Sequence, residues 1–340
     1  MEQWIDSFPH DCDVTVTEMF SEHNLFRTRD LDQAREEVAR VFCPHKLTTS
    51  DKSGLVNTVH NSVKREKVSL NYLDYGAEVH IEPGELGSFF LVQIPLSGGS
   101  LVHCGNQVVE SNPRMATIPN PTEKLEMTWL DQSPHLLVHI PRPVLESRLS
   151  ELIQRDLTVP LRFELGMDLE RPQLAAWRKL VDLLASGVSS NQYQFHEGVH
   201  NQIEDMVITG LLMSHDHNYS ACISSHAEPL TPRSVRVVIE YCQDASQSMP
   251  TVSELAQVAG VSVRSLQETF RNYVGLTPTQ YLRDYRLRQV QKELTTHGSL
   301  FHSVSECAMH WGFTHLGRFS QQYADRFGEL PSVTLRMRDS

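Results

Sequence analysis

Two short segments in the last third of the sequence carry long polar side chains at helical spacing. In order along the chain these residues are Arg264, Gln267, Glu268, Arg271, Arg318, Ser320 and Gln321. Against the major-groove edges of DNA, Arg pairs with guanine, Gln with adenine and Glu with the cytosine amino group, while Ser reaches a base or a phosphate. The same side chains also suit a solvated helix face. The choice between these readings depends on the elements that carry them.

Both segments belong to an internal repeat. At a spacing of 52, Ser253, Glu254, Ala256 and Gly260 are matched by Ser305, Glu306, Ala308 and Gly312. After one inserted residue the spacing is 53, and Leu266, Phe270, Gly275, Pro278, Leu282 and Arg283 are matched by Phe319, Tyr323, Gly328, Pro331, Leu335 and Arg336. A duplicated unit makes a purely solvating role for both helices much less plausible than it would be for one helix.

Each copy has the residue pattern of a helix-turn-helix. A small residue allows two helices to cross closely, a glycine allows a positive φ in the turn, and two larger apolar residues four apart face inward. The residues with these structural roles are Ala256, Gly260, Leu266 and Phe270 in the first unit and Ala308, Gly312, Phe319 and Tyr323 in the second. Ser262 and Thr314 are the expected N-caps of the second helices.

An amphipathic helix is expected between the two units, with Leu287, Val290 and Leu294 facing inward. Its length would hold the units apart so that one chain addresses two successive major-groove segments about 34 Å apart. Arg283, Arg286, Arg288 and Lys292 are assigned to phosphates or to ion pairs with Asp284 and Glu293. The alternative is that the repeat forms only a protein-interaction bundle.

The charge distribution is asymmetric. The net charge is −12, which by itself argues against nucleic acid, because binding phosphates requires basic side chains. From Leu230 onward, however, 12 basic residues stand against 10 acidic ones, and the rest of the chain has 18 against 32. The repeat therefore lies in the mildly basic part of an acidic chain.

Upstream, residues from about 54 to 140 read as many short strands separated by Gly, Pro, Asn and Asp. This spacing predicts an antiparallel barrel or double-sheet sandwich, which can enclose one small ligand. Tyr72, Phe89, Phe90 and Trp129 are the aromatic candidates for an effector pocket, and about half of such residues would simply be core.

Helical patterns follow from about 141 to 215, one of them with Pro172 in its first turn and Gly187 just past its end. The last helix carries an apolar stripe of Ile203, Val207 and Leu211, flanked by Met206 and Ile208, that suits either the core or a partner helix. Residues 216–231 break the periodicity and read as a linker.

From about Pro232 to Arg338 the sequence resembles the AraC/XylS family of transcription regulators, whose DNA-binding domain is two helix-turn-helix units joined by a long helix. The residues that match its C-terminal signature are Ala308, Gly312, Phe313, Phe319, Tyr323, Gly328 and Pro331. The resemblance implies base-contacting roles for Arg264, Gln267 and Glu268 in the first unit and for Arg318, Ser320 and Gln321 in the second. Gly317 departs from the family, because it offers no side chain where many members have a polar one. The segment "GFTHLGRFSQQYADRFGELPSVTL" is similar to the corresponding segment of the XylS branch. Members of that branch are typically activators that respond to aromatic acids and related catabolites.

The N-terminal segments "YGAEVHI", "FFLVQIPLSGG" and "LLVHIPR" are similar to the AraC-binding-like domain of the same branch, a cupin-like barrel that senses the effector. The resemblance implies an α+β chain with three parts. Residues 1–215 form the effector-binding and dimerisation domain, 216–231 the linker, and 232–338 an all-α DNA-binding domain with units at about 251–271 and 303–324. The implied partners are promoter DNA, RNA polymerase, a small-molecule effector and a second copy of the chain.

Two rival functions remain open at the level of sequence. A cupin-type metal-dependent enzyme would use His80, Glu82 and Glu85, completed by His103 or His139. A DNA-repair transferase would need a reactive cysteine, but the six cysteines are scattered singly without activating neighbours. The expectation is therefore no catalysis, no cofactor and no metal. Acidic residues at the N-terminus and the lack of a long apolar run predict a cytoplasmic protein without a membrane span.

Overall fold

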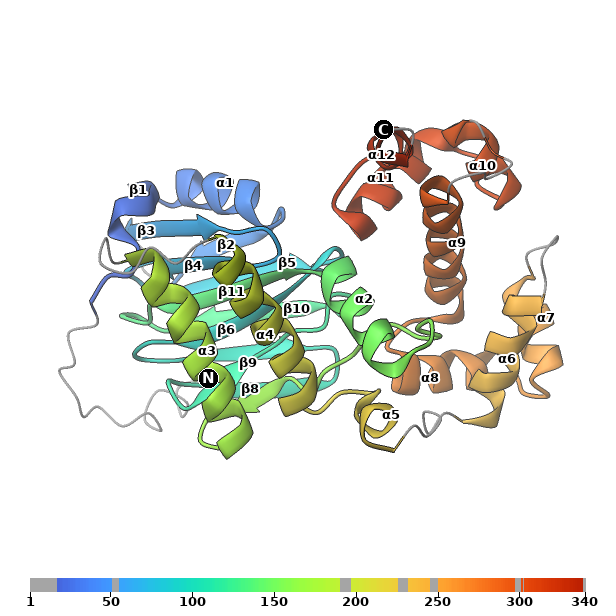
Figure 1. Cartoon of the computed structure of the whole chain (residues 1–340), viewed down its shortest axis with the longest axis horizontal. Coiled ribbons are helices and arrows are strands. Elements are labelled where there is room, and N and C mark those ends of the chain that lie inside the picture. Colours follow the sequence, from blue (N-terminus) through green and yellow to red (C-terminus); the bar gives the residue numbers. More distant parts are fainter. Residues whose placement is uncertain are drawn as a thin grey trace. The chain divides into compact units, whose positions relative to one another are not determined.

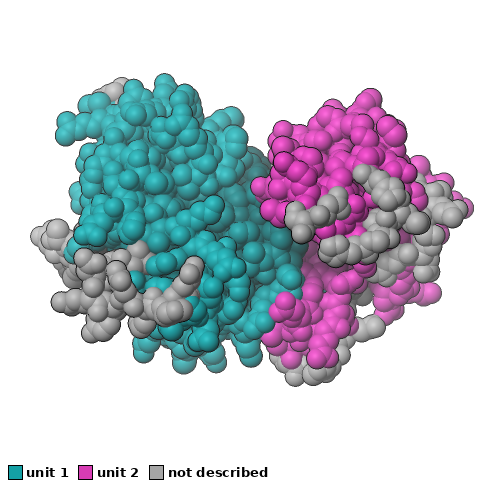
Figure 2. Space-filling view, turned by 45° about the horizontal axis from the view of Figure 1, so that its top comes forward, with its two compact units in different colours: residues 1–149, 163–220 teal, residues 150–162, 221–340 magenta. Residues whose placement is uncertain are grey.

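The computed structural model describes residues 17–50, 55–189, 197–225, 232–244, 250–296, 301 and 303–338. They form two compact units (Figures 1 and 2). Unit 1 comprises residues 1–149 and 163–220, and unit 2 comprises residues 150–162 and 221–340. The chain thus leaves unit 1 after Leu149, contributes a short stretch to unit 2, and returns to unit 1 at Phe163.

Two antiparallel sheets make the centre of unit 1. One has the strand order β1-β3-β4-β11-β6-β9-β12 and the other has the order β2-β5-β10-β7-β8. The strands are β1 (Asn24–Asp30), β2 (Lys46–Thr49), β3 (Leu55–Lys64), β4 (Ser69–Asp74), β5 (Val79–Gly84), β6 (Phe89–Pro95), β7 (Ser100–Cys104), β8 (Gln107–Ser111), β9 (Met115–Thr117), β10 (Leu125–Trp129), β11 (His135–Pro141) and β12 (Gly166–Asp168). The expected cupin-like antiparallel architecture is confirmed as two sheets, which do not join into a closed barrel.

Unit 1 contains elements that the sequence pattern did not reveal. A 3-10 turn (Ser21–His23), β1, helix α1 (Leu31–Val41) and β2 all precede residue 54, where the strand-rich region was expected to begin. Asp30 caps α1 by accepting a hydrogen bond from the Gln33 backbone N–H at 2.7 Å. Ala34 and Val38 on its inner face are buried in the core between the sheets. The core therefore depends partly on residues outside the predicted barrel.

Three further helices belong wholly or mostly to unit 1: α2 (Arg142–Ile153), α3 (Pro172–Ser189) and α4 (Glu197–Ser214). Figure 1 shows α3 and α4 side by side, and the Trp177 indole N–H on α3 donates to the Val207 carbonyl on α4 at 2.9 Å. Gly187 was expected just past the end of α3, but the helix continues to Ser189. A glycine is tolerated inside a helix when packing stabilises the flanking turns.

The apolar stripe of α4 faces the interior of unit 1. Ile203, Val207 and Leu211 are buried, whereas Met206 is 52% exposed. The helix is also held by a buried carboxylate, because Glu204 accepts from the backbone N–H groups of Lys67 at 2.6 Å and Val68 at 3.1 Å. Burial raises the pKa of Glu204 above its ordinary value. The expected stripe therefore serves the core.

Unit 2 is helical. Its elements are α5 (Ser220–Ser225), which begins at the edge of unit 1, α6 (Arg233–Asp244), α7 (Val252–Val258), α8 (Val263–Val274), α9 (Pro278–Thr295), α10 (Val304–His310), α11 (Leu316–Phe327) and α12 (Pro331–Arg338). The long helix α9 connects the two helix pairs α7–α8 and α10–α11 (Figure 1). Leu287, Val290 and Leu294 on α9 are buried, and they pack in one cluster with Phe319 and Tyr323 of α11. Within the described ranges, no helix has both the length and the apolarity that a membrane crossing requires.

We predict that unit 1 loses stability on mild acidification. Burial lowers the pKa of His60 to about 4 and that of His135 to about 3. The unfolded chain has histidine pKa values near 6.5, so below that pH it binds more protons than the folded chain. Stability is fully present above about pH 6.5 and falls as the pH decreases toward the folded values; at pH 5 each such histidine removes about 2 kcal/mol. Urea unfolding at pH 7.5 and pH 5 measures the loss.

The control is His60→Gln, whose amide can still donate to the Asn71 side chain that the His60 Nε2 contacts at 3.2 Å. This variant should show a smaller difference between the two pH values, by about 2 kcal/mol, because one titrating group is gone. An unchanged difference would show that His60 does not carry the effect.

Candidate nucleic-acid interface and ligand cavity

The first helix-turn-helix is set by local hydrogen bonds at each of its ends. Thr251 and Glu254 form a capping box at the start of α7, and the Ser262 hydroxyl accepts from the Ser265 N–H at 3.1 Å to cap α8. Between the helices Gly260 has a φ of +67°. A residue with a Cβ would be strained there, so the glycine in the repeat has a backbone reason.

The second unit repeats this arrangement with one change. Ser303 caps α10 by accepting from the Glu306 N–H at 3.1 Å, and Gly312 turns the chain with a φ of +81°. Thr314, however, is not the cap of α11, because His315 holds that position and makes no side-chain capping bond. The inserted residue explains the difference, since a spacing of 53 from Ser262 falls on position 315.

Each pair of helices is held by the expected small and apolar residues. All of them are less than 4% exposed: Ala256, Leu266, Phe270, Ala308, Phe319 and Tyr323. The Tyr323 hydroxyl also donates to the Thr334 hydroxyl of α12 at 3.0 Å, and burial raises the pKa of Tyr323 above its ordinary value, although the contact with Thr334 acts in the opposite direction. These contacts fix the rotation of α8 and α11 about their axes, and with it the set of side chains left outside.

The outward faces of α8 and α11 carry the polar residues selected from sequence. Those exposed to solvent are Arg264, Gln267, Glu268, Arg271, Arg318 and Gln321, while Ser320 is half-buried. Gln321 donates from its Nε2 to Asp325 Oδ1 at 2.8 Å, one turn further along α11. A side chain added at Gly317 would meet nothing within 4 Å, so the first turn of α11 presents bare backbone in open space. Such a turn can approach a neighbouring surface closely.

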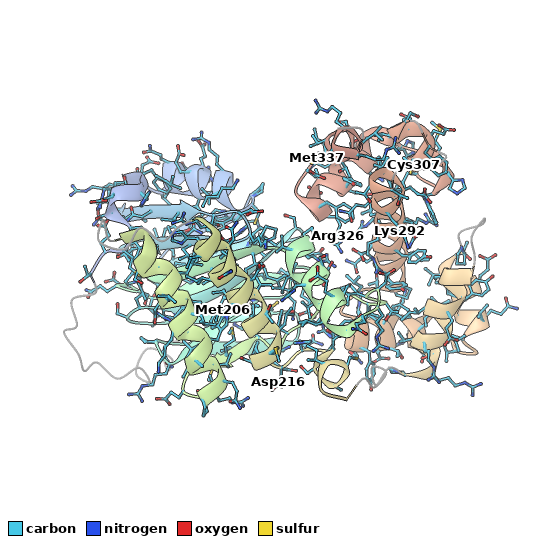
Figure 3. The ribbon with its side chains drawn as sticks, in the orientation of Figure 1. Met206, Asp216, Lys292, Cys307, Arg326 and Met337 are labelled. Carbon is cyan, nitrogen blue, oxygen red and sulfur yellow. The ribbon has the colours of Figure 1, made fainter. Side chains whose placement is uncertain are left out.

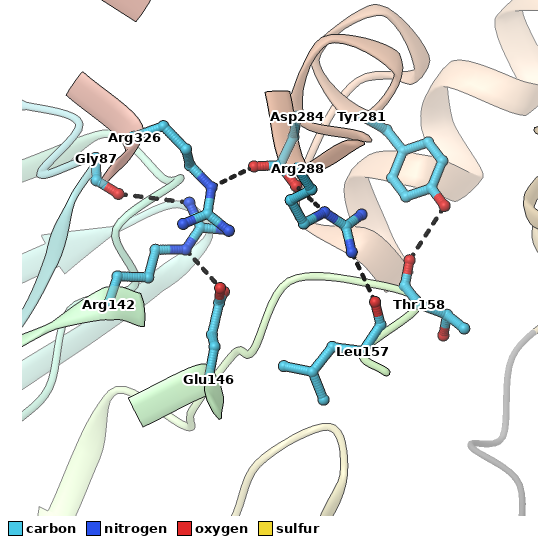
Figure 4. A network of polar contacts seen from close by, with 9 residues as sticks. All are labelled: Gly87, Arg142, Glu146, Leu157, Thr158, Tyr281, Asp284, Arg288 and Arg326. Atoms are coloured by element: carbon cyan, nitrogen blue, oxygen red, sulfur yellow. Dashed lines mark hydrogen bonds and ion pairs between the residues drawn. The ribbon is translucent and has the colours of Figure 1, made fainter. Parts of the chain in front are cut away.

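A buried ion cluster joins α9 to α11. The Asp284 carboxylate contacts Arg326 Nε at 2.6 Å and Arg288 Nε at 3.1 Å (Figure 4). Asp284 and Arg326 are both less than 10% exposed. The ion pair between Arg288 and Asp284 was one of two assignments made from sequence, but Arg326 was not singled out. A contact between residues 42 positions apart leaves no local signal in the sequence.

The stretch of residues 150–162, here called the strap, packs on the first helix-turn-helix and on α9. The Tyr281 hydroxyl donates to the Thr158 carbonyl at 3.1 Å, and Arg288 Nη1 donates to the Leu157 carbonyl at 2.6 Å (Figure 4). Arg162 Nη1 donates to the Asn272 carbonyl at the end of α8 at 3.4 Å, and a Cβ on Gly275 would lie 2.6 Å from Arg162 Nε. The strap is therefore built into unit 2.

Unit 1 contains an apolar cavity between its two sheets that is partly open to solvent. Its walls come from both sheets, with Leu73, Leu91 and Leu137 on one side and Ile81 and Met127 on the other. Phe42 and Cys43, which follow α1, complete the lining.

Of the four aromatic residues expected in this pocket, two line the cavity and two do not. Phe89 and Trp129 line the cavity. Tyr72 and Phe90 are buried but lie outside its lining, and Phe90 packs edge-to-face on Phe163 at 5.6 Å between ring centroids. Because neighbouring residues on a strand face opposite sides, Phe89 and Phe90 of β6 cannot both reach one cavity. The candidates selected from sequence therefore included residues on both faces of the same sheet.

The structure brings together only His80 and Glu82 of the rival metal site. His80 and Glu82 lie on the face of β5 away from the cavity, where His80 Nε2 is 3.5 Å from both Glu82 and Glu126 carboxylates and Glu82 pairs with Lys46. His139 instead packs between the rings of Phe42 and Phe89 in the other sheet. Among the described residues no cluster of three or more His, Cys, Asp or Glu side chains could hold a metal ion.

Of the cysteines that the structure describes, Cys104, Cys222, Cys242 and Cys307 are buried and Cys43 is partly buried. Burial raises the pKa of Cys43 and Cys242 to about 11 and that of Cys307 to about 12. A nucleophilic cysteine needs the opposite shift, because the thiolate is the reactive form. Cys12 lies outside the described residues.

Paired helix-turn-helix units on a connecting helix, together with a cavity-bearing two-sheet domain, define a ligand-sensing DNA-binding protein. Family models agree with both parts: an AraC-binding-like domain matches residues 34–213 and a helix-turn-helix domain matches residues 255–337. The chain belongs to the AraC/XylS family of transcription regulators.

Relatives of known description span most of the chain. The probable thc operon regulatory protein of Rhodococcus erythropolis is 30% identical over 311 residues, which cover 90% of this chain and 93% of that protein. The XylDLEGF operon transcriptional activator 3 of Pseudomonas putida is 27% identical over 287 residues, 84% of each chain. Among solved structures, the AraC-like transcriptional activator CuxR is 15% identical with a TM-score of 0.42, over 78% of this chain and 94% of that chain.

We predict that Arg318→Ala weakens DNA binding selectively at one half-site. If Arg318 pairs with a guanine edge, its loss costs about 1–3 kcal/mol there and much less on unrelated DNA. Fluorescence anisotropy with a footprinted promoter fragment and with a random duplex of equal length measures both affinities.

The matched control is Arg336→Ala, which removes an exposed arginine of α12 in the same unit without touching either of the two outward helix faces. Equal loss on both duplexes for Arg318→Ala would show that this residue contacts only phosphate.

Proposed function

We propose that this regulator activates transcription when a small molecule occupies the cavity of unit 1. The observation that carries the proposal is the pairing within one chain of two outward polar helices on a shared connecting helix with a cavity-bearing sheet domain. Relatives described as an operon regulatory protein and an operon transcriptional activator support it. The chain acts without catalysis, cofactor or metal, in the cytoplasm.

At the promoter, α8 and α11 each enter a major groove. The first helix reads with Arg264, Gln267, Glu268 and Arg271, and the second reads with Arg318, Ser320 and Gln321. The helix α9 sets their separation to one turn of the duplex, about 34 Å. A regulator placed on tandem sites in this way activates by contacting RNA polymerase.

We propose functional parts with the boundaries expected from sequence, although residues 216–220 of the expected linker belong to unit 1 and helix α5 lies within that linker. Residues 1–215 sense the effector and self-associate, residues 216–231 connect, and residues 232–338 bind DNA. One stretch departs from this linear plan, because the strap lies within the sensor segment of the sequence and packs with the DNA-binding helices. The strap is accordingly the element that carries a change in unit 1 to α9.

The effector acts by shifting a population between two forms, and it must bind one form better than the other to do so. In the restrained form the strap is docked through the Tyr281 hydroxyl, Arg288 and Arg162. In the active form the strap is released and the two reading helices are free to occupy tandem sites. Each hydrogen bond of the strap therefore opposes activation.

We predict that Tyr281→Phe raises promoter activity in the absence of effector. The change removes only the hydroxyl that donates to Thr158, while the ring keeps its packing on Phe270 at 5.5 Å between centroids. Losing one hydrogen bond of about 1 kcal/mol shifts the equilibrium about fivefold toward release. A reporter fused to the regulated promoter, assayed with and without effector, measures the change.

The control is Tyr323→Phe, which removes a buried hydroxyl of the same unit that contacts Thr334 and not the strap. If effector-free activity falls or stays the same in Tyr281→Phe while DNA affinity is intact, release of the strap is not the activating step.

Self-association uses a face of α4 other than the stripe expected from sequence. Val199, Met206 and Met213 are 39%, 52% and 64% exposed, and they recur every seven residues (Met206 is labelled in Figure 3). An apolar residue repeated at this interval lines one seam of a helix and is typical of pairing with a second helix. We propose that two copies of the chain associate through this seam.

We predict that Met206→Glu shifts the protein from dimer to monomer. A carboxylate at the centre of the seam would have to be desolvated against the same residue of the other copy, so association should weaken by at least about tenfold. Sedimentation velocity across a concentration series measures the equilibrium. Met337→Glu, at an exposed methionine of α12, is the control. A dimer unaffected by Met206→Glu would place the interface elsewhere.

A further inference from the structure

The cavity of unit 1 contains a polar side chain without a proper partner. Gln93 on β6 lines the cavity and is fully buried at 0% exposure. Its Oε1 finds no hydrogen-bond partner among the described residues, and its Nε2 contacts only the Met127 sulfur at 3.2 Å. A thioether is a weak acceptor, and a buried amide left in this condition is costly to the fold. Gln93 therefore places one unpartnered acceptor and one weakly paired donor in the wall of the cavity.

A second unpartnered group lies on the opposite sheet. Trp129 on β10 lines the same cavity, is 3% exposed, and its Nε1 has no hydrogen-bond partner within the described parts of the chain. Its ring is held in place by stacking on His135 at 3.7 Å and by an edge contact with Tyr75 at 5.6 Å between centroids. Buried tryptophan N–H groups usually have a partner. The walls of the cavity thus contain an unpartnered indole N–H from one sheet and an incompletely paired amide from the other.

The rest of the lining is uncharged. It contains no Asp, Glu, Lys or Arg among the residues that the structure describes. Cys43 and His45 are the lining residues whose ordinary pKa values lie nearest to pH 7, and both are uncharged at that pH. Burial raises the pKa of Cys43 to about 11 and lowers that of His45 below its ordinary value. A carboxylate transferred here would lose its hydration without meeting a cation, which is strongly unfavourable.

We propose that this cavity binds an uncharged, ring-sized apolar molecule that carries an amide-like group, with its carbonyl accepting from Trp129 and its N–H donating to Gln93. This inference rests on the proposed function, since it names the class of the effector. It replaces the aromatic acid that the family resemblance implies with the neutral counterpart of the same shape. The apolar walls, including Leu73, Leu91 and Met127, hold the ring.

Isosteric pairs of neutral and anionic ligands test the proposal directly on the full chain. Benzamide and benzoate differ in charge but hardly in shape, and phenylacetamide with phenylacetate extends the pair by one methylene. Isothermal titration at pH 7.5 should give the amide of at least one pair an affinity about 30-fold or more above that of its acid, because only the acid must be desolvated as an ion. Equal or tighter binding of the acids overturns the proposal, and so does the failure of both amides to bind.

Two variants locate the contact. Gln93→Met preserves the length of the side chain and should lower amide affinity by about tenfold, the value of a lost hydrogen bond to a buried partner. Tyr72→Phe, which alters a buried strand residue outside the cavity, should leave the affinity unchanged. Melting curves establish that both variants are folded. An affinity unaffected by Gln93→Met would show that this amide does not receive the ligand.

The same experiment separates this proposal from the proposed function. An amide that binds as expected but leaves promoter activity unchanged contradicts the effector role and supports the ligand class. Promoter activation by a member of the anionic set, with direct binding in the cavity, supports the effector role and overturns the ligand class.

Discussion

The carboxylate of Asp284 holds the DNA-binding unit together. It lies in the first half of the connecting helix, is almost fully buried, and contacts Arg326 of the second reading helix and Arg288 one turn further along its own helix. A buried charge is tolerated only when it is paired with good geometry, and removal of one partner is strongly destabilising. Arg288 also donates to the strap. The same carboxylate therefore helps to fix both the orientation of α11 and the position where the strap packs on α9.

The duplicated unit could be predicted from sequence because its determinants are local. Gly260, Gly312 and Ser262 act within a few residues of their own position, so residue type and spacing are sufficient to place them. The one local error, Thr314 in place of His315, came from locating the inserted residue too late in the repeat. By contrast, Arg326 and the strap depend on contacts between residues far apart along the chain, and no periodicity records such contacts.

The sensor unit was harder to predict, for a related reason. Its strands are recognisable one by one, but the cavity depends on which face of each strand meets the other sheet. Of the adjacent residues Phe89 and Phe90, the first therefore lines the cavity and the second is buried outside it. The contribution of α1 and Phe42 was not foreseen, since a short helix before the first clear strand gives no sign of what it covers. The role of Gln93 could not be predicted from sequence either, because it depends on the absence of a hydrogen-bond partner for its Oε1 among the described residues.

The path of the chain through residues 150–162 has a consequence for how this regulator can be divided. A fragment that begins at the linker would contain both reading helices and the connecting helix, yet Tyr281, Arg288 and the turn at Gly275 would lose the backbone that covers them. The two activities of the protein are therefore not modular in the simple sense of one domain after another. A sensor grafted onto this DNA-binding unit must therefore bring a strap that fits Tyr281, Arg288 and the turn at Gly275.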